Sequence, residues 1–344
     1  MILKKPKKLV PGDTVALISP SAGLAGEKDI LYRTNMGIER LQKNFNLKTK
    51  VMKNSLKGID YLYNHPEKRA EDIHEALLDK NIKALISFIG GKDSLRIVPY
   101  LDENIINNNP KIFMGYSDST AIHLKFLKSK VMSFYGPAVL TDFAENLHMD
   151  NYTIDNINKS LFSNKTIGSI ETSNYIRKFG LMWEEKNKNI ERPLIKNSDY
   201  EIINGRGVAH GNLIGGCMES LNNLRGTDLF PTVEFFKNKI LFLENSEDQS
   251  PLWLLEQHIR TLGYMGILNA VSGIIIGKPQ NNINYDEYKD IWKKMAREWK
   301  IYNTPIFYNA SFGHNEPKCI IPFGAFAKLD TNNKTFHILE NSCI

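Results

Sequence analysis

The 344-residue sequence contains little cysteine and no long apolar run. Its three cysteines, Cys217, Cys319 and Cys343, are odd in number and far apart, so they favour neither a disulfide framework nor a zinc site. No apolar run approaches the length of a membrane span, and residues 15–18 are too few for the core of a secretory signal. We therefore expect a cytoplasmic protein with reduced thiols, no metal and no membrane partner.

Charge of one sign is also scarce. The formal net charge is only +6, and its one dense cluster consists of Lys4, Lys5, Lys7 and Lys8. No interleaving of basic and aromatic residues follows this cluster, which argues against a nucleic-acid partner. Because basic runs this short are usually solvated, we expect the lysines to lead into the first strand.

Strand-like and helix-like segments alternate over about the first 150 residues. The segment 83–89 is nearly continuous in apolar residues, which is typical of a strand covered on both faces. This alternation is the pattern of βαβ units, so we predict an open parallel sheet flanked by helices. The expected strands are 14–19, 47–52, 83–89, 112–114 and 131–135, and the expected helices are 29–43, 67–79, a segment ending near Tyr100, and 120–128.

The composition changes near residue 141. From there to about residue 200, Asn, Lys, Ser and Thr dominate, which predicts a linker and surface loops. We therefore expect an N-terminal α/β domain over residues 1–150, a linker with a loop near the site over 151–200, and a second domain over 201–344. The second domain should contain strands at 207–213, 239–244 and 271–276, helices at 252–262 and 285–299, and short β segments at 305–309, 319–322 and 326–329.

Ser117 occupies a turn between an apolar strand and a helix. Gly115 leaves room for a tight turn, whereas Ser119 stands where the general nucleophile-elbow pattern has glycine. At such a turn the serine hydroxyl projects from the sheet edge, and the next helix N-terminus offers free N–H groups to an oxyanion. The competing interpretation is a simple helix cap, because Ser and Asp are preferred at N-cap positions. The turn alone leaves both interpretations open.

Two further residues complete a candidate set of nucleophile, base and orienting acid. Glu244 ends an apolar strand, where a carboxylate is well placed to orient a base, and His314 lies in a loop before the segment 319–322. A serine hydroxyl needs a neutral imidazole to accept its proton, and the imidazole needs an acceptor that fixes its tautomer. Ser117, His314 and Glu244 would meet these requirements.

Spacing alone does not select these residues, because the chain has eight histidines and many carboxylates. Glu247 and Asp248 compete with Glu244, although they follow the strand and are expected to face water. Four other histidines are expected to lie outside the site. His123 should be packed or exposed on a helix, and His65 should lie in a turn. His210 should lie in a strand, and His258 should be solvated in the middle of a helix.

Five short motifs occur in order along the chain: Phe88-Ile89-Gly90-Gly91, Gly115-Tyr116-Ser117-Asp118, Leu213-Ile214-Gly215-Gly216, Phe242-Leu243-Glu244-Asn245 and Gly313-His314. Together they resemble the LD-carboxypeptidase family of serine peptidases, which includes muropeptide LD-carboxypeptidases and microcin C immunity peptidases. The likeness covers nearly the whole chain, from Pro11-Gly12-Asp13 to Ile321-Pro322-Phe323-Gly324.

The resemblance implies a flavodoxin-like N-terminal α/β domain and a smaller, β-rich C-terminal α/β domain, with the site spanning both. It implies Ser117 as the nucleophile, His314 as general base and then acid, and Glu244 as the orienting carboxylate. The oxyanion hole would be formed by the backbone N–H groups of Gly91 and Asp118. The resemblance further implies a homodimer that needs no metal or organic cofactor.

The resemblance also bears on the substrate. Gly90 is expected to line its binding site, and the segment from Trp183 to Pro193 looks like that of the immunity peptidases, where a loop tryptophan stacks on a nucleobase. Alternatively, Trp183 anchors its loop to the domain. Immunity peptidases tend to carry asparagine where this chain has Cys217 and lysine where it has Asp248. The expected substrate is therefore a muropeptide tetrapeptide that releases D-alanine, or a peptidyl- or aminoacyl-nucleotide of the microcin C type.

Two rival functions stay open at this point. The first is a binding protein whose α/β sheet edge holds a small ligand without chemistry. The second is a conventional α/β-hydrolase esterase, which is disfavoured because it would carry glycine at the position of Ser119.

Overall fold

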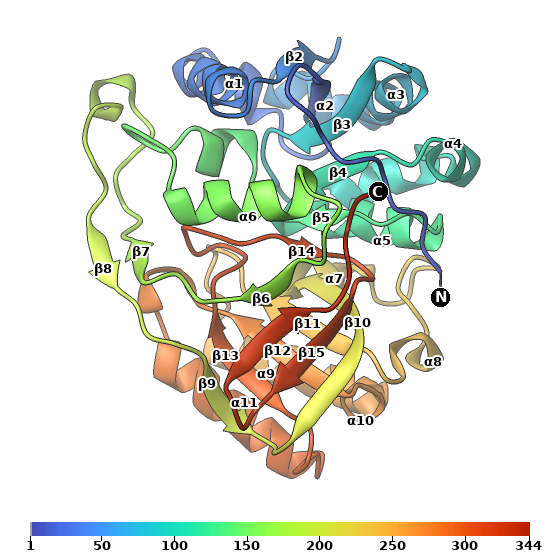
Figure 1. Cartoon of the computed structure of the whole chain (residues 1–344), viewed down its shortest axis with the longest axis vertical. Helices are drawn as coiled ribbons and strands as arrows, with labels where there is room; N and C mark the ends of the chain where they lie inside the picture. The colour runs from blue at the N-terminus through green and yellow to red at the C-terminus, as the bar shows by residue number, and fades with distance from the viewer. Residues whose placement is uncertain (1) are drawn as a thin grey trace.

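Residues 2–344 are described by a computed structural model that contains two large β-sheets with helices packed around them (Figure 1). The first sheet has six strands in the order β14-β5-β4-β3-β1-β2, and β1 to β5 pair in parallel as predicted. Its strands are β1 (Thr14–Ile18), β2 (Lys48–Val51), β3 (Ile82–Ser87), β4 (Ile112–Gly115), β5 (Phe134–Tyr135) and β14 (Ile321–Pro322).

Alternate residues of the central strands enter two separate apolar cores, one on each face of the sheet. In β1, Val15 and Leu17 pack into one core, whereas Ala16 and Ile18 pack into the other. Because side chains alternate between the faces of a strand, burial on both faces requires a continuous apolar run. This explains why these strands were predictable from composition.

The longer helices around the first sheet follow the predicted positions: α1 (Leu31–Phe45), α3 (Pro66–Leu78) and α5 (Thr120–Lys128). The segment that ends at Tyr100 is a 3-10 helix (Ser94–Tyr100), and Pro99 within it lacks the N–H that an α-helix would use. Two further helices, α2 (Ile59–Asn64) and α4 (Glu103–Asn108), were not predicted. With six residues each, they are too short to show helical periodicity.

The second sheet has eight strands in the order β6-β16-β15-β10-β11-β12-β13-β9. Strands β10 to β13 pair in parallel, and the other strands pair antiparallel. The strands are β6 (Gly168–Ile170), β9 (Glu201–Asn204), β10 (Val208–Cys217), β11 (Ile240–Glu244), β12 (Gly273–Gly277), β13 (Ile306–Ala310), β15 (Phe326–Asp330) and β16 (Thr335–Ile338). The helices are α7 (Met218–Leu224), α8 (Val233–Phe236), α9 (Leu252–Tyr264), α10 (Ile267–Ala270) and α11 (Tyr285–Glu298).

Strand β10 continues four residues beyond its predicted end at residue 213. It pairs first with β15 and then, through Gly215 and Gly216, with β11. A Cβ atom on Gly215 would lie 1.6 Å from the carbonyl oxygen of Phe242, so only glycine fits there. The paired glycines disguise the strand in the sequence because glycine usually marks a turn.

The prediction of a linker and surface loops between residues 141 and 200 is wrong for α6 (Asn151–Leu161). Its buried face includes Thr153, Asn156 and Ser160, and these polar residues conceal the amphipathic pattern. A π-helix (Val139–Phe143) precedes it. The following ribbon, β7 (Tyr175–Arg177) and β8 (Leu194–Lys196), carries the intervening residues 178–193, which we call the strap.

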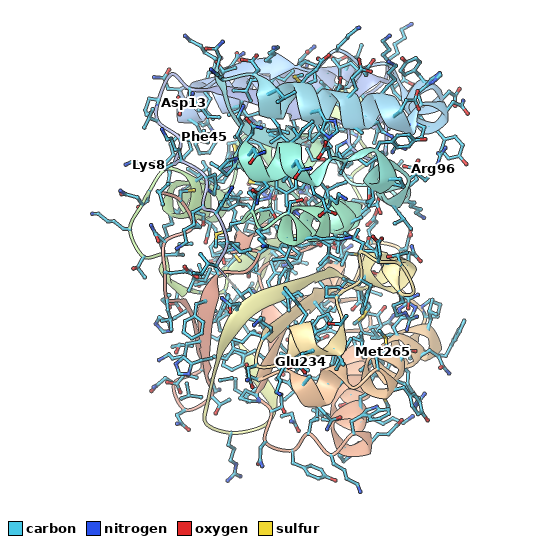
Figure 2. All side chains as sticks on the ribbon, turned by 90° about the vertical axis from the view of Figure 1, so that its right-hand side faces the viewer. Lys8, Asp13, Phe45, Arg96, Glu234 and Met265 are labelled. Carbon is cyan, nitrogen blue, oxygen red and sulfur yellow. The ribbon has the colours of Figure 1, made fainter. Side chains whose placement is uncertain are left out.

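The two halves of the chain are joined by more than a linker. Strand β14, expected in the second domain, belongs to the first sheet, where Ile321 pairs with Tyr135. One apolar cluster contains Leu124 of the first half together with Leu213 of the second, and side chains fill the space between the sheets (Figure 2). Near the ends of the chain, the N–H of Ile344 donates to the carbonyl of Pro6 at 2.9 Å. Within residues 2–344, no helix has the length and apolar character required to cross a bilayer.

Candidate active site

Ser117 lies two residues after the end of β4 and has a left-handed backbone conformation, with φ +62°. Such a conformation is costly for a residue with a side chain and is typical of the turn that presents a nucleophile. A 3-10 turn (Ser117–Ser119) leads into α5, whose N-cap is Ser119 without a side-chain capping bond. The helix-cap interpretation of Ser117 is therefore wrong.

The structure brings Ser117, His314 and Glu244 together. His314 Nε2 lies 3.0 Å from Ser117 Oγ, and His314 Nδ1 lies 2.7 Å from Glu244 Oε2. Glu244 is the last residue of β11, and His314 lies in the loop that follows β13. The backbone N–H of His314 also donates to Glu244 Oε2 at 3.2 Å. Glu244 thus holds both the ring and the backbone of the histidine.

Glu247 approaches the same imidazole from the other side. Its Oε2 lies 2.8 Å from His314 Nε2, although half of the Glu247 side chain is exposed, so Glu247 faces water as predicted and also contacts the imidazole. Asp248 is mostly exposed and pairs with Lys92. Burial alone would lower the pKa of His314, but Glu244 and then Glu247 raise it to about 10. The hydrogen bond from His314 in turn lowers the pKa of Glu247 to about 2. Without substrate, this arrangement stabilises the imidazolium form.

Tyr135 joins two parts of the site, although nothing in the sequence singled it out. Its hydroxyl accepts a hydrogen bond from the N–H of Ser117 at 3.0 Å and donates one to Glu244 Oε1 at 2.5 Å. Burial, and then the charge of Glu244, raise the pKa of Tyr135 well above its ordinary value, so it acts as a neutral donor. The pairing of Tyr135 in β5 with Gly115 in β4 places it there.

Gly90, Gly91 and Asp118 surround the serine. A Cβ atom on Gly90 would lie 2.8 Å from Ser117 Cβ, so glycine permits this close approach. Gly91 has φ +151°, and Asp118 lies in the first turn of a helical segment, where backbone N–H groups lack partners within the helix. The side chain of Asp118 accepts hydrogen bonds from Ser21 Oγ at 2.5 Å and from the N–H of Ser94 at 2.7 Å. These bonds hold the turn in place.

The four other histidines considered from the sequence form no hydrogen bond with Ser117, His314 or Glu244, although the ring of His123 packs 5.6 Å from that of Tyr135. His123 is fully buried and contacts Ser133 Oγ and the carbonyl of Gly115, which agrees with the packed alternative. The prediction that His258 is solvated is wrong, since only 6% of it is exposed on the inward face of α9. His65 precedes α3 and His210 lies in β10, as predicted.

A cavity of about 450 Å³ opens beside Ser117 and His314. It is lined by Gly90 and Gly91, by Arg33 of α1, and by residues 179–183 and Arg192 of the strap. Trp183 lines this cavity and also packs with its ring 4.3 Å from the guanidinium carbon of Arg33. Trp183 is therefore placed both to contact a ligand in the cavity and to anchor its loop to the domain.

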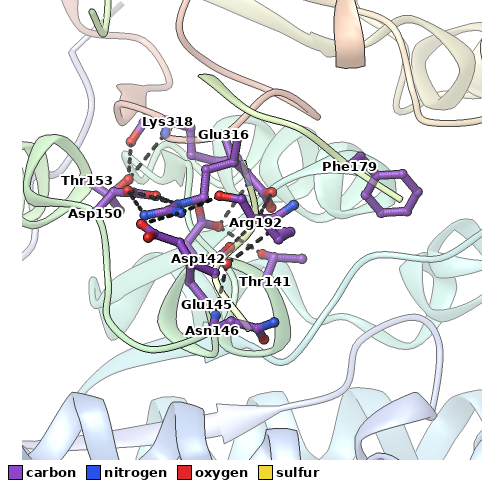
Figure 3. A network of polar contacts seen from close by, with 12 residues as sticks. Thr141, Asp142, Glu145, Asn146, Asp150, Thr153, Phe179, Arg192, Glu316 and Lys318 are labelled. Carbon is purple, nitrogen blue, oxygen red and sulfur yellow. Dashed lines mark hydrogen bonds and ion pairs between the residues drawn. The ribbon is translucent and has the colours of Figure 1, made fainter. Parts of the chain in front are cut away.

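Buried ion pairs anchor the strap beside this cavity (Figure 3). Arg192 donates to Glu145 Oε1 at 3.0 Å and to Glu316 Oε2 at 2.5 Å, and Lys318 lies 3.1 Å from Asp142. Burial would raise the pKa of Glu316, but Arg192 and then Lys318 lower it to about 2. The C-terminal end of the strap is thus held in a charged network, and Glu316 of this network is two positions from His314 in the sequence.

Within residues 2–344, one group of side chains has the spacing of a metal site. Possible ligand atoms of Cys217, Glu244 and His314 all lie within 4.8 Å of one another. Both oxygens of Glu244 already accept hydrogen bonds, from Tyr135 and His314, and burial raises the pKa of the Cys217 thiol well above its ordinary value. The hydrogen-bonded arrangement therefore accounts for these side chains without a metal.

Sequence comparisons identify the family. The LD-carboxypeptidase N-terminal domain matches residues 15–136, and the LD-carboxypeptidase C-terminal domain matches residues 210–329. A putative carboxypeptidase of Treponema pallidum is 30% identical over 81% of this chain and 79% of its own. The chain belongs to the LD-carboxypeptidase family. It is a serine-type carboxypeptidase, and therefore a hydrolase.

The carboxypeptidase is also similar to proteins of the microcin C immunity type. An MccF-like protein from Streptococcus pneumoniae, solved in complex with AMP, is 31% identical with a TM-score of 0.87, and the match covers 94% of this chain and 98% of that one. The microcin C7 self-immunity protein MccF of Escherichia coli is 28% identical over 96% of this chain and 94% of its own. These similarities confirm the predicted fold, with an N-terminal parallel sheet and a second α/β domain.

Proposed function

We propose that the carboxypeptidase hydrolyses a C-terminal amide bond through Ser117, His314 and Glu244. The observation that carries this proposal is the continuous hydrogen-bonded path from Ser117 Oγ through both ring nitrogens of His314 to Glu244. Two carboxylates, two domains and a strained serine turn meet there, which a passive binding site would not require.

In the proposed reaction, neutral His314 accepts the proton of Ser117 through Nε2 while Oγ attacks the amide carbonyl. Glu244 holds the Nδ1–H tautomer and stabilises the imidazolium that forms. The N–H groups of Gly91 and Asp118 would stabilise the oxyanion. His314 then protonates the departing amine, and a water molecule, activated by His314, hydrolyses the acyl-enzyme.

Ser117→Ala tests this assignment. We expect kcat to fall by about 10⁴-fold or more, because loss of the nucleophile removes the acyl-enzyme route. The matched control is Ser119→Ala, which removes a neighbouring buried hydroxyl that has no hydrogen-bond partner. Circular dichroism should report the same fold for both variants. Full activity of Ser117→Ala, or failure of a serine-directed reagent to label Ser117 in the wild type, would favour the non-catalytic binding alternative.

Two substrate classes fit the proposal. The family name supports a muropeptide tetrapeptide that releases D-alanine, as in peptidoglycan recycling. The similarity to MccF and to a relative solved with AMP supports a peptidyl- or aminoacyl-nucleotide of the microcin C type. The purified protein should be assayed on a muropeptide tetrapeptide and tested for binding of aspartyl sulfamoyl adenosine side by side.

Trp183→Ala separates the two classes. If the indole stacks on a nucleobase, its loss should weaken nucleotide substrates by about 5- to 150-fold and muropeptides far less. Trp183→Phe keeps an aromatic face and serves as the matched control. Equal losses on both substrates would contradict base stacking and favour a purely structural role for the indole.

We further propose that the enzyme acts as a cytoplasmic homodimer, as the family resemblance implies. Light scattering on the eluting protein should then give twice the 39.3 kDa mass of one chain. A mass of one chain at the concentration of the activity assay would contradict the dimer without affecting the catalytic proposal.

A further inference from the structure

Arg33 is a deeply buried cation without a carboxylate partner. It lies in the first turn of α1 and is only 3% exposed. Its Nε donates to the carbonyl of Leu140 at 2.6 Å, and its Nη1 donates to Asn146 Oδ1 at 3.3 Å. Over residues 2–344, no carboxylate oxygen lies within 4.0 Å of the guanidinium, and Nη2 makes no hydrogen bond.

Three other buried cations, at the strap and the elements that hold it, are paired with carboxylates. Arg192 contacts Glu145 and Glu316, and Lys318 contacts Asp142 (Figure 3). Arg177 donates to Asp150. Burial lowers the pKa of Arg33, while the nearby charges of Glu145 and Glu316 oppose this shift without touching the guanidinium. A buried charge without an opposite charge beside it is unfavourable, so the presence of Arg33 in the cavity wall points to an anionic ligand.

The position of Arg33 is suited to binding an anion. Arg33 and Ser117 line the same cavity of about 450 Å³, whose other arginine, Arg192, is already neutralised. A guanidinium presents its N–H groups in a planar fork that matches a carboxylate or phosphate. Trp183 covers one face of this fork, and Nε and Nη1 already donate to Leu140 and Asn146, which leaves Nη2 for a ligand.

We propose that Arg33 binds an anionic group of the substrate, either the C-terminal carboxylate of a peptide or the phosphate of a nucleotide. The proposal rests on the proposed function insofar as the ligand is a substrate of Ser117. It supplies what a carboxypeptidase needs to distinguish a chain end from an internal peptide bond, because only the chain end carries a free carboxylate.

The test measures binding in the non-hydrolysing Ser117→Ala protein by calorimetry. The probes are a muropeptide tetrapeptide ending in D-alanine, the same peptide as its C-terminal amide, and AMP. Arg33→Gln should weaken the peptide acid by about tenfold or more but the amide by less than about twofold, because only the acid carries the terminal charge. If AMP is weakened instead of the peptide acid, phosphate is the anion that Arg33 binds.

The matched control is Arg40→Gln on the same helix. Arg40 donates to backbone carbonyls of Phe143 and Glu145 and does not line the cavity, so this variant should bind all probes like its parent. Equal weakening of acid, amide and AMP by Arg33→Gln, or no weakening of any probe, would overturn the proposal. Because turnover is not measured, a failure of the catalytic proposal would be seen separately, in the wild-type assay.

In an active wild-type background, Arg33→Gln should raise KM for the peptide acid with little change in kcat, because the interaction is made in the bound substrate. Arg33→Lys should recover part of the loss, since lysine restores the charge but not the planar fork. A fall in kcat alone would contradict a role in binding.

Discussion

His314 illustrates how one side chain depends on its nearest charges. Glu244 faces one ring nitrogen, Ser117 and Glu247 face the other, and the ring of Tyr116 packs edge-on against the imidazole. Nε2 accepts from Ser117 when the ring is neutral and donates to Glu247 when it is protonated. The proposed reaction needs neutral His314, so the charge of Glu247 opposes that role in the unliganded enzyme. A substrate that displaces Glu247 would therefore release the base.

Glu247→Gln should move the acid limb of the kcat/KM profile to lower pH. The carboxylate favours the imidazolium, so its removal lowers the pKa of His314 and makes the neutral base available at lower pH. An opposite charge at this distance supports a displacement of about one pH unit or more. The measurement is the pH–rate profile of the variant against Asp248→Asn, whose carboxylate pairs with Lys92 instead. Identical acid limbs in the two variants would contradict this role of Glu247.

At the scale of elements, the strap shows how polar residues can form a defined structure. Its polar composition predicted a surface loop, and no apolar periodicity marked its contacts. Yet Arg192 and the residues it pairs with hold one end of the strap against the cavity, and Trp183 packs on α1. Ion pairs form between residues far apart in the chain, so a local pattern does not reveal them.

Arg192→Met should destabilise the protein by about 3–5 kcal/mol, because it leaves the buried carboxylate of Glu145 without an ion-pair partner. The measurement is the free energy of unfolding in urea. Arg206→Met, at an exposed position in the loop before β10, is the control and should change stability by less than about 0.5 kcal/mol. A loss within that range for Arg192→Met would show that the network contributes little to stability.

At the scale of the whole molecule, the two sheets behave as one structural unit. Strand β14 comes from the second half of the chain and completes the edge of the first sheet next to β5. The largest apolar cluster contains residues from both halves, and the proposed catalytic residues are likewise divided between them. Separation of the halves would expose both the cluster and the edge of β5.

We therefore expect a single cooperative transition when the protein is heated in a calorimeter. Leu124→Ala and Leu213→Ala, in opposite halves of the shared cluster, should each lower the same transition by about 2–5 kcal/mol of stability. Two resolved transitions, with each variant affecting only one of them, would instead indicate independently folding domains.

The sequence alone determined the features that local chemistry controls. Continuous apolar runs predicted the covered strands of the first sheet, amphipathic periodicity predicted α1, α3 and α5, and the strand-to-helix turn singled out Ser117. The family resemblance carried by the five motifs then selected Glu244 and His314. The short helices α2 and α4 were missed because six residues show no helical periodicity. Helix α6 was missed because polar residues lie on its buried face, and the end of β10 because its paired glycines are typical of a turn.

Only the tertiary structure decided which side chains meet. Ser117 and His314 are 197 residues apart, and their contact depends on packing between sheets rather than on either local pattern. The same packing places Tyr135 between Ser117 and Glu244, turns Glu247 toward the imidazole, and leaves Arg33 unpaired in the cavity wall. The burial and the electrostatic environment of a site depend on residues that are distant in the sequence, and these become neighbours only when the chain folds.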